Sequence, residues 1–417
     1  MRRPEGDAVD PRRQLLLELM TAGLKAVAGR GSVREALGPR VAALRADGRP
    51  LWLAAIGKAA SSMALGAHDA LGDAIERVLL VTKDGHVDQE ARALPGIEIR
   101  EAGHPVPDAR SLEAGAALLG FIEAMPRSAR PLFLVSGGAS SLAEALVPGV
   151  SLDDLRELNA TGLASGMPIA ELNARRRAIS RIKGGGVSHV VRGRGALALF
   201  ISDVPGDDPA VIGSGLLGPL AADGVAHSAP ADDIERIVVA SIELALEAVR
   251  ASATGMPVHV SARRFGEDAG RLAVRCAHEL HLSETALRVW GGESVMELPP
   301  RPGRGGRNQH CALAVARLIA GQDDLLLLAV GTDGTDGPTP DAGALVDGNT
   351  CARVACAGLD VDDCLRRADS ATALEAAGDL VHTGPTGTNV GDLIIGLKLS
   401  EAEARNWLAG RHGSVRL

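Results

Sequence analysis

The sequence predicts an α/β protein with a mainly parallel sheet, divided into two or three domains. A length of 417 residues exceeds the size at which one hydrophobic core usually suffices. Apolar residues make up 46% and charged residues 23% of the chain, as in an ordinary globular protein, which excludes wholesale disorder. Short apolar runs alternate with helical stretches, and this alternation is typical of parallel strands joined by helices.

The individual elements follow from the same alternation, since the apolar runs have the length of buried strands and the stretches between them the length of helices. Strands are predicted over residues 51–56, 78–81, 132–135, 196–202, 257–260, 286–289 and 325–330. Helices are predicted over residues 13–28, 59–71, 111–124, 151–164, 168–182, 232–252, 266–281 and 309–320. Residues 218–231 are rich in Gly, Ala and Pro and lack periodicity, so we place the domain junction there, between residues 1–230 and 231–417.

Charge and composition exclude several classes of protein. The 44 Lys and Arg against 52 Asp and Glu give a net charge of −8, which is unsuited to general binding of nucleic acid. Aromatic residues make up 2% with no tyrosine, which excludes base-stacking platforms. No apolar run approaches the ~20 residues of a membrane helix, the start does not resemble a signal peptide, and the five cysteines form no C-x-x-C pair. We therefore expect a cytoplasmic protein that binds neither membrane nor nucleic acid.

Polar clusters follow several of the predicted strands. In open α/β sheets ligands bind beyond the carboxyl ends of the strands, so these positions are candidates for a site. Lys58 follows the first strand, where its ammonium suits phosphate or carboxylate, although a surface lysine is the simpler interpretation of this position alone. Ser136, Gly137 and Gly138 follow the third, where paired glycines let backbone N–H groups converge on an anion. A tight turn with a serine N-cap would use the same residues.

Two aspartates and an arginine occupy comparable places. Asp203 and Asp333 follow later strands, and carboxylates there suit Mg²⁺, which proteins usually hold with one or two carboxylates plus phosphate oxygens. Asp-Gly pairs also form ordinary turns, so either segment alone is open between turn and site. Arg307 opens a helix from a glycine-rich loop and can bind a carboxylate or phosphate through two parallel hydrogen bonds.

The helix predicted over residues 168–182 would carry Asn173, Arg176, Ser180 and Lys183 on one face. Such a face is usually only solvated, but the glycine run after Lys183 would let backbone come close to a ligand. The sequence has no G-x-S-x-G, no H-E-x-x-H and no G-x-G-x-x-G after a strand. These absences disfavour esterases, metalloproteases and typical nicotinamide-dependent dehydrogenases.

Eight short motifs, taken in order, resemble the type II glycerate kinases, also called glycerate 2-kinases, and the C-terminal third looks like the domain named MOFRL. The motifs are IGKA (56–59), GHPVPD (103–108), VSGG (135–138), SRIKGG (180–185), SDV (202–204), GGRNQ (305–309), GTDGTDGPT (331–339) and TGPTGTNV (383–390). Each motif alone is weak, but eight in the same order over about residues 15–400 are specific.

The resemblance implies two α/β domains, the first with a Rossmann-like parallel sheet and the second of the MOFRL type (about residues 286–400), with the active site in the cleft between them. It implies Mg²⁺-dependent phosphoryl transfer from ATP to D-glycerate, giving 2-phosphoglycerate and ADP. The catalytic residues would be Lys58, Asp203, Arg307 and Asp333, and the two aspartates are also the candidates for Mg²⁺. A homodimer is a possible assembly.

The same resemblance implies two sets of binding residues. The residues expected to bind ATP are Ser136, Gly137, Gly138, Ser140, Lys183, Gly184, Gly213, Ser214 and Gly215. The residues expected to bind the small-molecule substrate are Lys58, Glu293, Arg307, Asn308, Thr386 and Asn389.

Two other functions stay open at this point. Some proteins of this kind carry the name hydroxypyruvate reductase, so an NAD(P)H-dependent reductase is one alternative. The other is a sugar-acid-binding regulatory protein without catalysis, because residues 216–224 depart from the Thr- and Asp-rich turn that is usual in the family. Lys58, Asp203, Arg307 and Asp333 together argue against a pure binder, which has little need for both cations and paired carboxylates.

Overall fold

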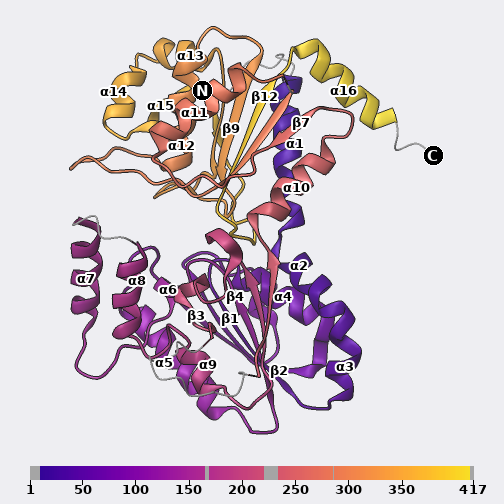
Figure 1. Cartoon of the computed structure of the whole chain (residues 1–417), viewed down its shortest axis with the longest axis vertical. Helices are drawn as coiled ribbons and strands as arrows, with labels where there is room; N and C mark the ends of the chain where they lie inside the picture. The colour runs from indigo at the N-terminus through magenta and orange to yellow at the C-terminus, as the bar shows by residue number, and fades with distance from the viewer. Residues whose placement is uncertain (1–9, 165–168, 220–232, 285, 414–417) are drawn as a thin grey trace. The chain divides into compact units, whose positions relative to one another are not determined.

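The computed structural model describes residues 10–164, 169–219, 233–284 and 286–413, shown as ribbons in Figure 1. The chain separates into two compact units. Unit 1 consists of Met1–Ala26, Ile242–Thr386 and Gly391–Leu417, and unit 2 of Val27–Ser241 and Gly387–Val390. The division expected after residue 230 is therefore displaced to 241, and the first 26 residues group with the C-terminal part of the chain.

Unit 2 is built on a parallel sheet of six strands in the order β3-β2-β1-β4-β5-β6. Its strands are β1 (Leu51–Ile56), β2 (Ile75–Lys83), β3 (Ile97–Ala102), β4 (Arg130–Val135), β5 (Leu197–Ile201) and β6 (Glu235–Ala240). This is the strand order of the Rossmann fold, in which the direction of winding reverses between β1 and β4. The helices that follow these two strands therefore leave the sheet in different directions, and the edge between them is where a Rossmann-like domain usually binds its ligand.

Helices of unit 2 connect these strands. The α-helices are α2 (Gly29–Leu37), α3 (Val41–Ala46), α4 (Ala60–Leu71), α5 (Ala109–Ala124), α6 (Ala139–Leu142), α7 (Leu152–Ala164), α8 (Ile169–Ala178) and α9 (Gly186–Val190). Single 3₁₀ turns lie at Gly38–Arg40, Gly72–Ala74, Ala91–Ala93, Pro205–Asp207 and Ile212–Ser214.

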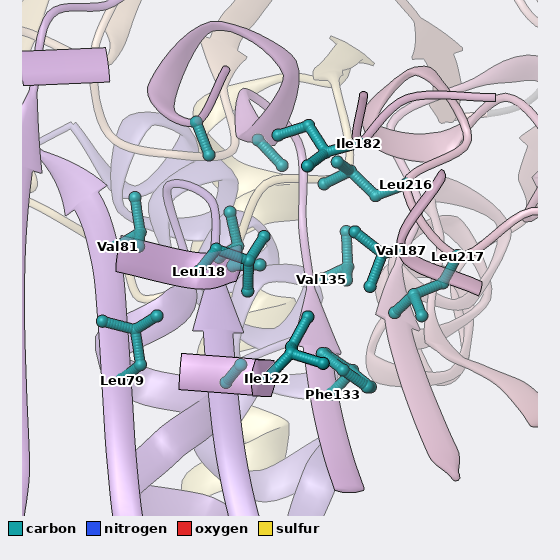
Figure 2. Packing of buried hydrophobic residues seen from close by; sticks show 14 of the residues in the cluster. Leu79, Val81, Leu118, Ile122, Phe133, Val135, Ile182, Val187, Leu216 and Leu217 are labelled. Carbon is teal, nitrogen blue, oxygen red and sulfur yellow. The ribbon is translucent and has the colours of Figure 1, made fainter. Parts of the chain in front are cut away.

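The central strands of unit 2 are buried along almost their whole length, which is why they appear in the sequence as continuous apolar runs. On one face of the sheet, Val81 and Val135 pack together with Leu118 and Ile122 of α5, as Figure 2 shows. Leu216 belongs to the same cluster, so part of the atypical 216–224 segment is core rather than surface loop.

Unit 1 carries a second six-stranded sheet in the order β11-β10-β9-β12-β8-β7. Its strands are β7 (Val258–Val260), β8 (Leu287–Gly292), β9 (Leu325–Gly331), β10 (Gly343–Asp347), β11 (Leu380–Val381) and β12 (Asp392–Lys398). Only β7 and β8 pair in parallel. The expectation of a mainly parallel sheet thus holds for unit 2 and fails here, because residues 332–342 between β9 and β10 are too few for a crossover helix.

The helices of unit 1 include the N-terminal one. They are α1 (Pro11–Ala26), α10 (Ile242–Ser252), α11 (Ala269–His281), α12 (Arg307–Leu318), α13 (Thr350–Cys356), α14 (Val361–Arg366), α15 (Ser370–Ala377) and α16 (Glu401–Gly413). α1 packs on α10 and α16 and buries Leu15, Leu16 and Leu19 completely. This burial is the physical reason why the start of the chain belongs with its end.

Two predicted helices are wrong in part. The described part of residues 232–252 is strand β6 followed by helix α10, because Ile237, Val238 and Val239 favour an extended backbone over a helix. The helix predicted over 168–182 ends at Ala178, and Ser180 instead forms an antiparallel bridge with Leu146. The four polar side chains assigned to one helix face therefore do not share one. Most of the junction proposed at 218–231 lies outside the described residues.

None of the helices in the described part of the chain combines the length and the apolar character that a membrane crossing requires.

Helix α5 offers a test of how tightly unit 2 is packed. A Cβ on Gly115 would lie 2.0 Å from the backbone oxygen of Glu144, whereas one on Gly120 of the same helix would meet nothing within 4 Å. We expect Gly115→Ala to destabilise the protein by about 1–3 kcal/mol through overpacking. Gly120→Ala should stabilise it by about 1 kcal/mol, since alanine is the better helix former. Thermal unfolding of both variants checks this, and equal shifts would contradict the close contact.

Candidate active site

The loops after β1 and β4 are joined by direct backbone contact. The N–H of Lys58 donates to the oxygen of Gly137 (3.0 Å), and the N–H of Ala59 donates to Oγ of Ser136 (3.1 Å). A Cβ on Gly57 would lie 2.2 Å from the same Oγ, so this approach requires glycine. Ser136 is fully buried and acts within the turn, while Lys58 is half-buried at its edge.

Polar side chains surround this turn. Together with its two glycines they form what we call the switch-point cluster: Lys58, His104, Gly137, Gly138, Asp203 and Asn389. Nδ2 of Asn389 donates to Oδ2 of Asp203 (3.2 Å), and a Cβ on Gly137 would lie 2.0 Å from each of these two atoms. A Cβ on Gly138 would lie 3.1 Å from the His104 ring and from Cγ of Lys58. Position 137 therefore requires glycine, position 138 favours it, and a cation, a carboxylate and an amide lie close to their backbone.

The remaining residues expected to bind ATP lie elsewhere in unit 2. Ser140 is half-buried in α6. Gly184 and the loop of Gly213, Ser214 and Gly215 meet through a hydrogen bond from the N–H of Gly184 to the oxygen of Ser214 (3.0 Å). Lys183 is only 4% exposed, and its ammonium donates to Glu144, a residue that the sequence did not single out.

Unit 1 contains a second group of polar residues, which we call the arginine cluster: Glu293, Arg307, Asn308, Asp336 and Asp392. Nη1 of Arg307 donates to Oε1 of Glu293 (2.9 Å) and to the oxygen of Ser294 (2.7 Å), and its Nη2 lies 3.5 Å from Oδ2 of Asp392. Nδ2 of Asn308 donates to the other oxygen of Asp392 (2.9 Å). The guanidinium is thereby held between two carboxylates, with 35% of its side chain exposed.

Asp392 is buried at the start of β12 and has an incomplete hydrogen-bond shell. Among the described residues, its Oδ2 has no hydrogen-bond partner, although Nη2 of Arg307 lies 3.5 Å away. Burial raises the pKa of Asp392 to about 6, an effect that Arg307 opposes and that the negative charges of Glu293 and Asp333 reinforce. No sequence pattern points directly to Asp392, because an aspartate that opens a strand looks like a turn residue.

Asp336 determines how helix α12 begins. Its carboxylate accepts the backbone N–H groups of Asn308 (3.1 Å) and Gln309 (2.7 Å), which are two of the unpaired donors at the start of the helix. Burial raises the pKa of Asp336 to about 7, although these hydrogen bonds and the charge of Arg307 oppose the rise. Asp336 therefore holds the first turn of α12 in place, and with it the positions of Arg307 and Asn308.

The other predicted residues of unit 1 lie in the loops beside this cluster. Asp333 is buried, and its Oδ1 accepts the N–H (2.9 Å) and the hydroxyl (3.1 Å) of Thr335. The hydroxyl of Thr386 donates to the backbone oxygen of Thr332. Asp203 and Asp333 belong to different units, and the described residues contain no group of three or more His, Cys, Asp or Glu side chains arranged to hold a metal.

Comparisons with known proteins agree with this architecture. A family model described as a domain of unknown function (DUF4147) matches residues 15–249, and a model of the MOFRL family matches residues 286–392. The D-glycerate 2-kinase of Thermotoga maritima is 34% identical to this chain over 92% of it and 98% of the relative. A putative hydroxypyruvate reductase of Agrobacterium vitis is also 34% identical, over 81% of this chain and 96% of the relative.

A crystal structure of glycerate kinase from Thermotoga maritima matches with a TM-score of 0.79 at 32% identity, covering 93% of this chain and 99% of that one. The six-stranded parallel sheet, the mixed second sheet and these matches define a two-domain α/β enzyme of the kinase type. The chain belongs to the glycerate 2-kinase family.

The raised pKa of Asp336 predicts a pH-dependent stability. A carboxyl whose pKa is about 7 in the folded chain and about 4 in the unfolded chain binds its proton more tightly when folded. Its contribution to stability is therefore complete below about pH 4 and is lost as the pH rises towards 7. We expect the free energy of unfolding of Asp336→Asn, relative to that of the native protein, to increase by about 1–3 kcal/mol from pH 5 to pH 8.

Urea unfolding of the native protein and the variant across this pH range measures the effect. Asp324→Asn, at an exposed position of the same unit, is the matched control and should show no such trend. A constant difference between the native protein and Asp336→Asn would contradict the assigned pKa.

Proposed function

We propose that this protein transfers the γ-phosphoryl group of ATP to the 2-hydroxyl of D-glycerate in an Mg²⁺-dependent reaction, giving 2-phosphoglycerate and ADP. The observation that carries the proposal is the switch-point cluster in a chain of the glycerate 2-kinase family. There, Lys58 and Asp203 flank a turn in which a Cβ at position 137 would lie 2.0 Å from the carboxylate. A cation, a carboxylate and closely approaching backbone are what phosphate binding requires.

The reaction forms a bond from the glycerate hydroxyl oxygen to the γ-phosphorus and breaks the bond from that phosphorus to the β–γ bridging oxygen. The hydroxyl proton is released to the solvent, and ADP is the leaving group. Little covalent chemistry falls to the protein, so positioning and neutralisation of charge supply most of the rate. Lys58 neutralises charge on the phosphates, and Gly137 and Gly138 let the phosphates come close to the backbone. Arg307 binds the carboxylate of glycerate or the transferred phosphoryl group through its exposed edge.

Mg²⁺ fits the donor chemistry of the switch-point cluster. The Asp203 carboxylate lies beside the Asn389 side chain, directly over the backbone of Gly137, and Mg²⁺ prefers one or two such oxygen ligands together with phosphates. In this role Asp203 holds the ion and Asn389 keeps the carboxylate oriented. Bound Mg²⁺ supplies neutralisation of the phosphate charge. Asp333 is the second candidate ligand, and an active site in a cleft between the domains stays a prediction.

A reductase acting on hydroxypyruvate is the second candidate, because one relative at 34% identity is named a putative hydroxypyruvate reductase. The turn after β1, where the Rossmann order would place a dinucleotide, contains Gly57, Lys58 and Ala59 rather than three spaced glycines. A lysine at this turn suits phosphate transfer, and the missing glycines weaken the case for a dinucleotide.

The decisive assay incubates the purified protein with D-glycerate, ATP and Mg²⁺, and follows ADP and the phosphoglycerate isomer. We expect ADP and 2-phosphoglycerate in equal amounts, and no turnover after removal of Mg²⁺ with a chelator. Formation of 3-phosphoglycerate alone would contradict the proposed regiochemistry. NADH oxidation with hydroxypyruvate, without ATP turnover, would establish the reductase instead, and ligand binding without either turnover would establish the regulatory protein.

Arg307 and Arg304 provide a matched pair of variants in one glycine-rich loop. Arg304 pairs with Glu375 on the surface, with 57% and 59% of the two side chains exposed, whereas Arg307 belongs to the arginine cluster. Arg307→Ala should cost about 2–4 kcal/mol in kcat/KM, which is the usual range for one electrostatic donor in a transition state. Arg304→Ala should leave kcat/KM unchanged. Equal kcat/KM values for the two variants would show that Arg307 does not act in the reaction.

A further inference from the structure

Glu144 and Lys183 form an ion pair inside unit 2. Glu144 is completely buried, and 2% of the Lys183 side chain is exposed. Oε2 of Glu144 accepts from the ammonium of Lys183, while Oε1 accepts the N–H of Ala145 (2.9 Å) and the hydroxyl of Ser180 (2.6 Å). The two oxygens of the carboxylate thus accept hydrogen bonds from different partners. The ammonium is covered by protein, so it does not present a cation to an approaching ligand.

The pair joins the two ends of a long segment of the chain. Between Glu144 and Lys183 the chain leaves to form α7 and α8 and then returns (Figure 1). At these two ends, the N–H of Val147 donates to the oxygen of Ile179 (3.0 Å), and the N–H of Arg181 donates to the oxygen of Ala145 (2.7 Å). Residues that are distant in sequence are thereby fixed beside each other at the end of α6.

Both members of the pair connect to loops that carry predicted site residues. Glu144 follows the turn of Ser136, Gly137 and Gly138 after one short helix. Lys183 is followed by Gly184 and Gly185, whose N–H groups donate to the oxygens of Ser214 (3.0 Å) and Gly215 (2.7 Å). The covalent chain, the ion pair and these two hydrogen bonds therefore connect the loop after β4 to the loop of Gly213, Ser214 and Gly215.

We propose that Glu144 and Lys183 are positioning residues, which hold the loop of Gly184 and Gly185, and through it Ser214 and Gly215, in place beside the loop after β4. This inference rests on the proposed function only in taking these loops to bind ATP. It assigns Lys183 a role through Glu144 and not as a ligand of the nucleotide.

The energetics of burial make this assignment testable. Removing one partner of a buried ion pair leaves a lone charge and is strongly destabilising, whereas replacing both partners by neutral groups is often nearly neutral. Burial lowers the pKa of Lys183, and the charge of Glu144 and its hydrogen bond to the ammonium oppose that change. A positioning pair should therefore tolerate neutral replacement of both members, but a lysine that binds phosphate should not.

Three variants separate the two roles: Glu144→Gln, Lys183→Met and the double variant. Glutamine retains an oxygen for Ala145 and Ser180 and changes the atom that faces Lys183. Glu171→Gln is the matched control, since Glu171 forms an exposed pair with Arg175 on α8, with 51% and 54% of the side chains exposed. For each protein we would measure hydrogen exchange of the Gly184 and Gly185 amides without ligand, and the Kd for ATP with Mg²⁺.

Each single variant should speed exchange of the two amides at least tenfold and raise the Kd for ATP at least tenfold. The double variant should return both quantities to within about threefold of the native protein, and Glu171→Gln should change neither. Single variants that behave like the native protein overturn the proposal. So does a double variant that regains slow exchange but binds ATP as weakly as Lys183→Met, because Lys183 would then be a direct ligand.

The proposal can still be tested if the single variants do not fold. If the single variants do not fold, the double variant alone must fold, protect the amides and bind ATP, and its failure overturns the proposal. The exchange measurement needs no nucleotide. Suppose that the amides are protected in the native protein and exchange faster in the single variants, but that the native protein does not bind ATP. That result would refute the proposed function and leave the positioning role intact.

Discussion

Backbone contact between the loops after β1 and β4 is the constraint on which the switch-point cluster depends. Parallel strands deliver their carboxyl ends to one edge of a sheet, and the reversal of strand order separates the helices that follow β1 and β4. Gly57 lets the two loops approach to within a hydrogen bond, where a side chain would collide with Ser136, and Gly137 lets Asp203 and Asn389 lie close to the loop after β4. Lys58, Asp203 and Asn389 can gather there because the backbone occupies so little space.

In unit 1, the arginine cluster depends on the balance of charge between one arginine and the carboxylates around it. A guanidinium with partly buried surroundings needs nearby negative charge, and Arg307 obtains it from Glu293 and Asp392. Asp392 in turn is costly to bury, as its raised pKa shows, and the charge of Arg307 offsets part of that cost. Asp336 holds the first turn of α12 in place, so the two neighbouring residues Arg307 and Asn308 face fixed partners. The rigidity of this arrangement suits a residue that must meet an anion in a defined direction.

Strands of both sheets and the supporting residues show where prediction from the sequence failed. β3 and β6 are partly exposed along their length, so neither appears as a clean apolar run. β12 was missed although it is almost wholly buried, since the glycine in its middle interrupts the β-branched pattern. Glu144, Asp336 and Asp392 accept hydrogen bonds from residues as far as 84 positions away in sequence, and no local motif encodes such contacts.

The sequence by itself determined the α/β class, the Rossmann-like N-terminal sheet, the central strands and the family, because continuous apolar runs and ordered glycine motifs are local properties. Its eight motifs also marked most of the residues that gather in each cluster. Only the tertiary structure decided that α1 belongs with the C-terminal unit, that the second sheet is mixed, and that Lys183 is covered by Glu144. These features depend on which distant segments exclude water from one another, and burial of that kind is a property of the folded chain alone.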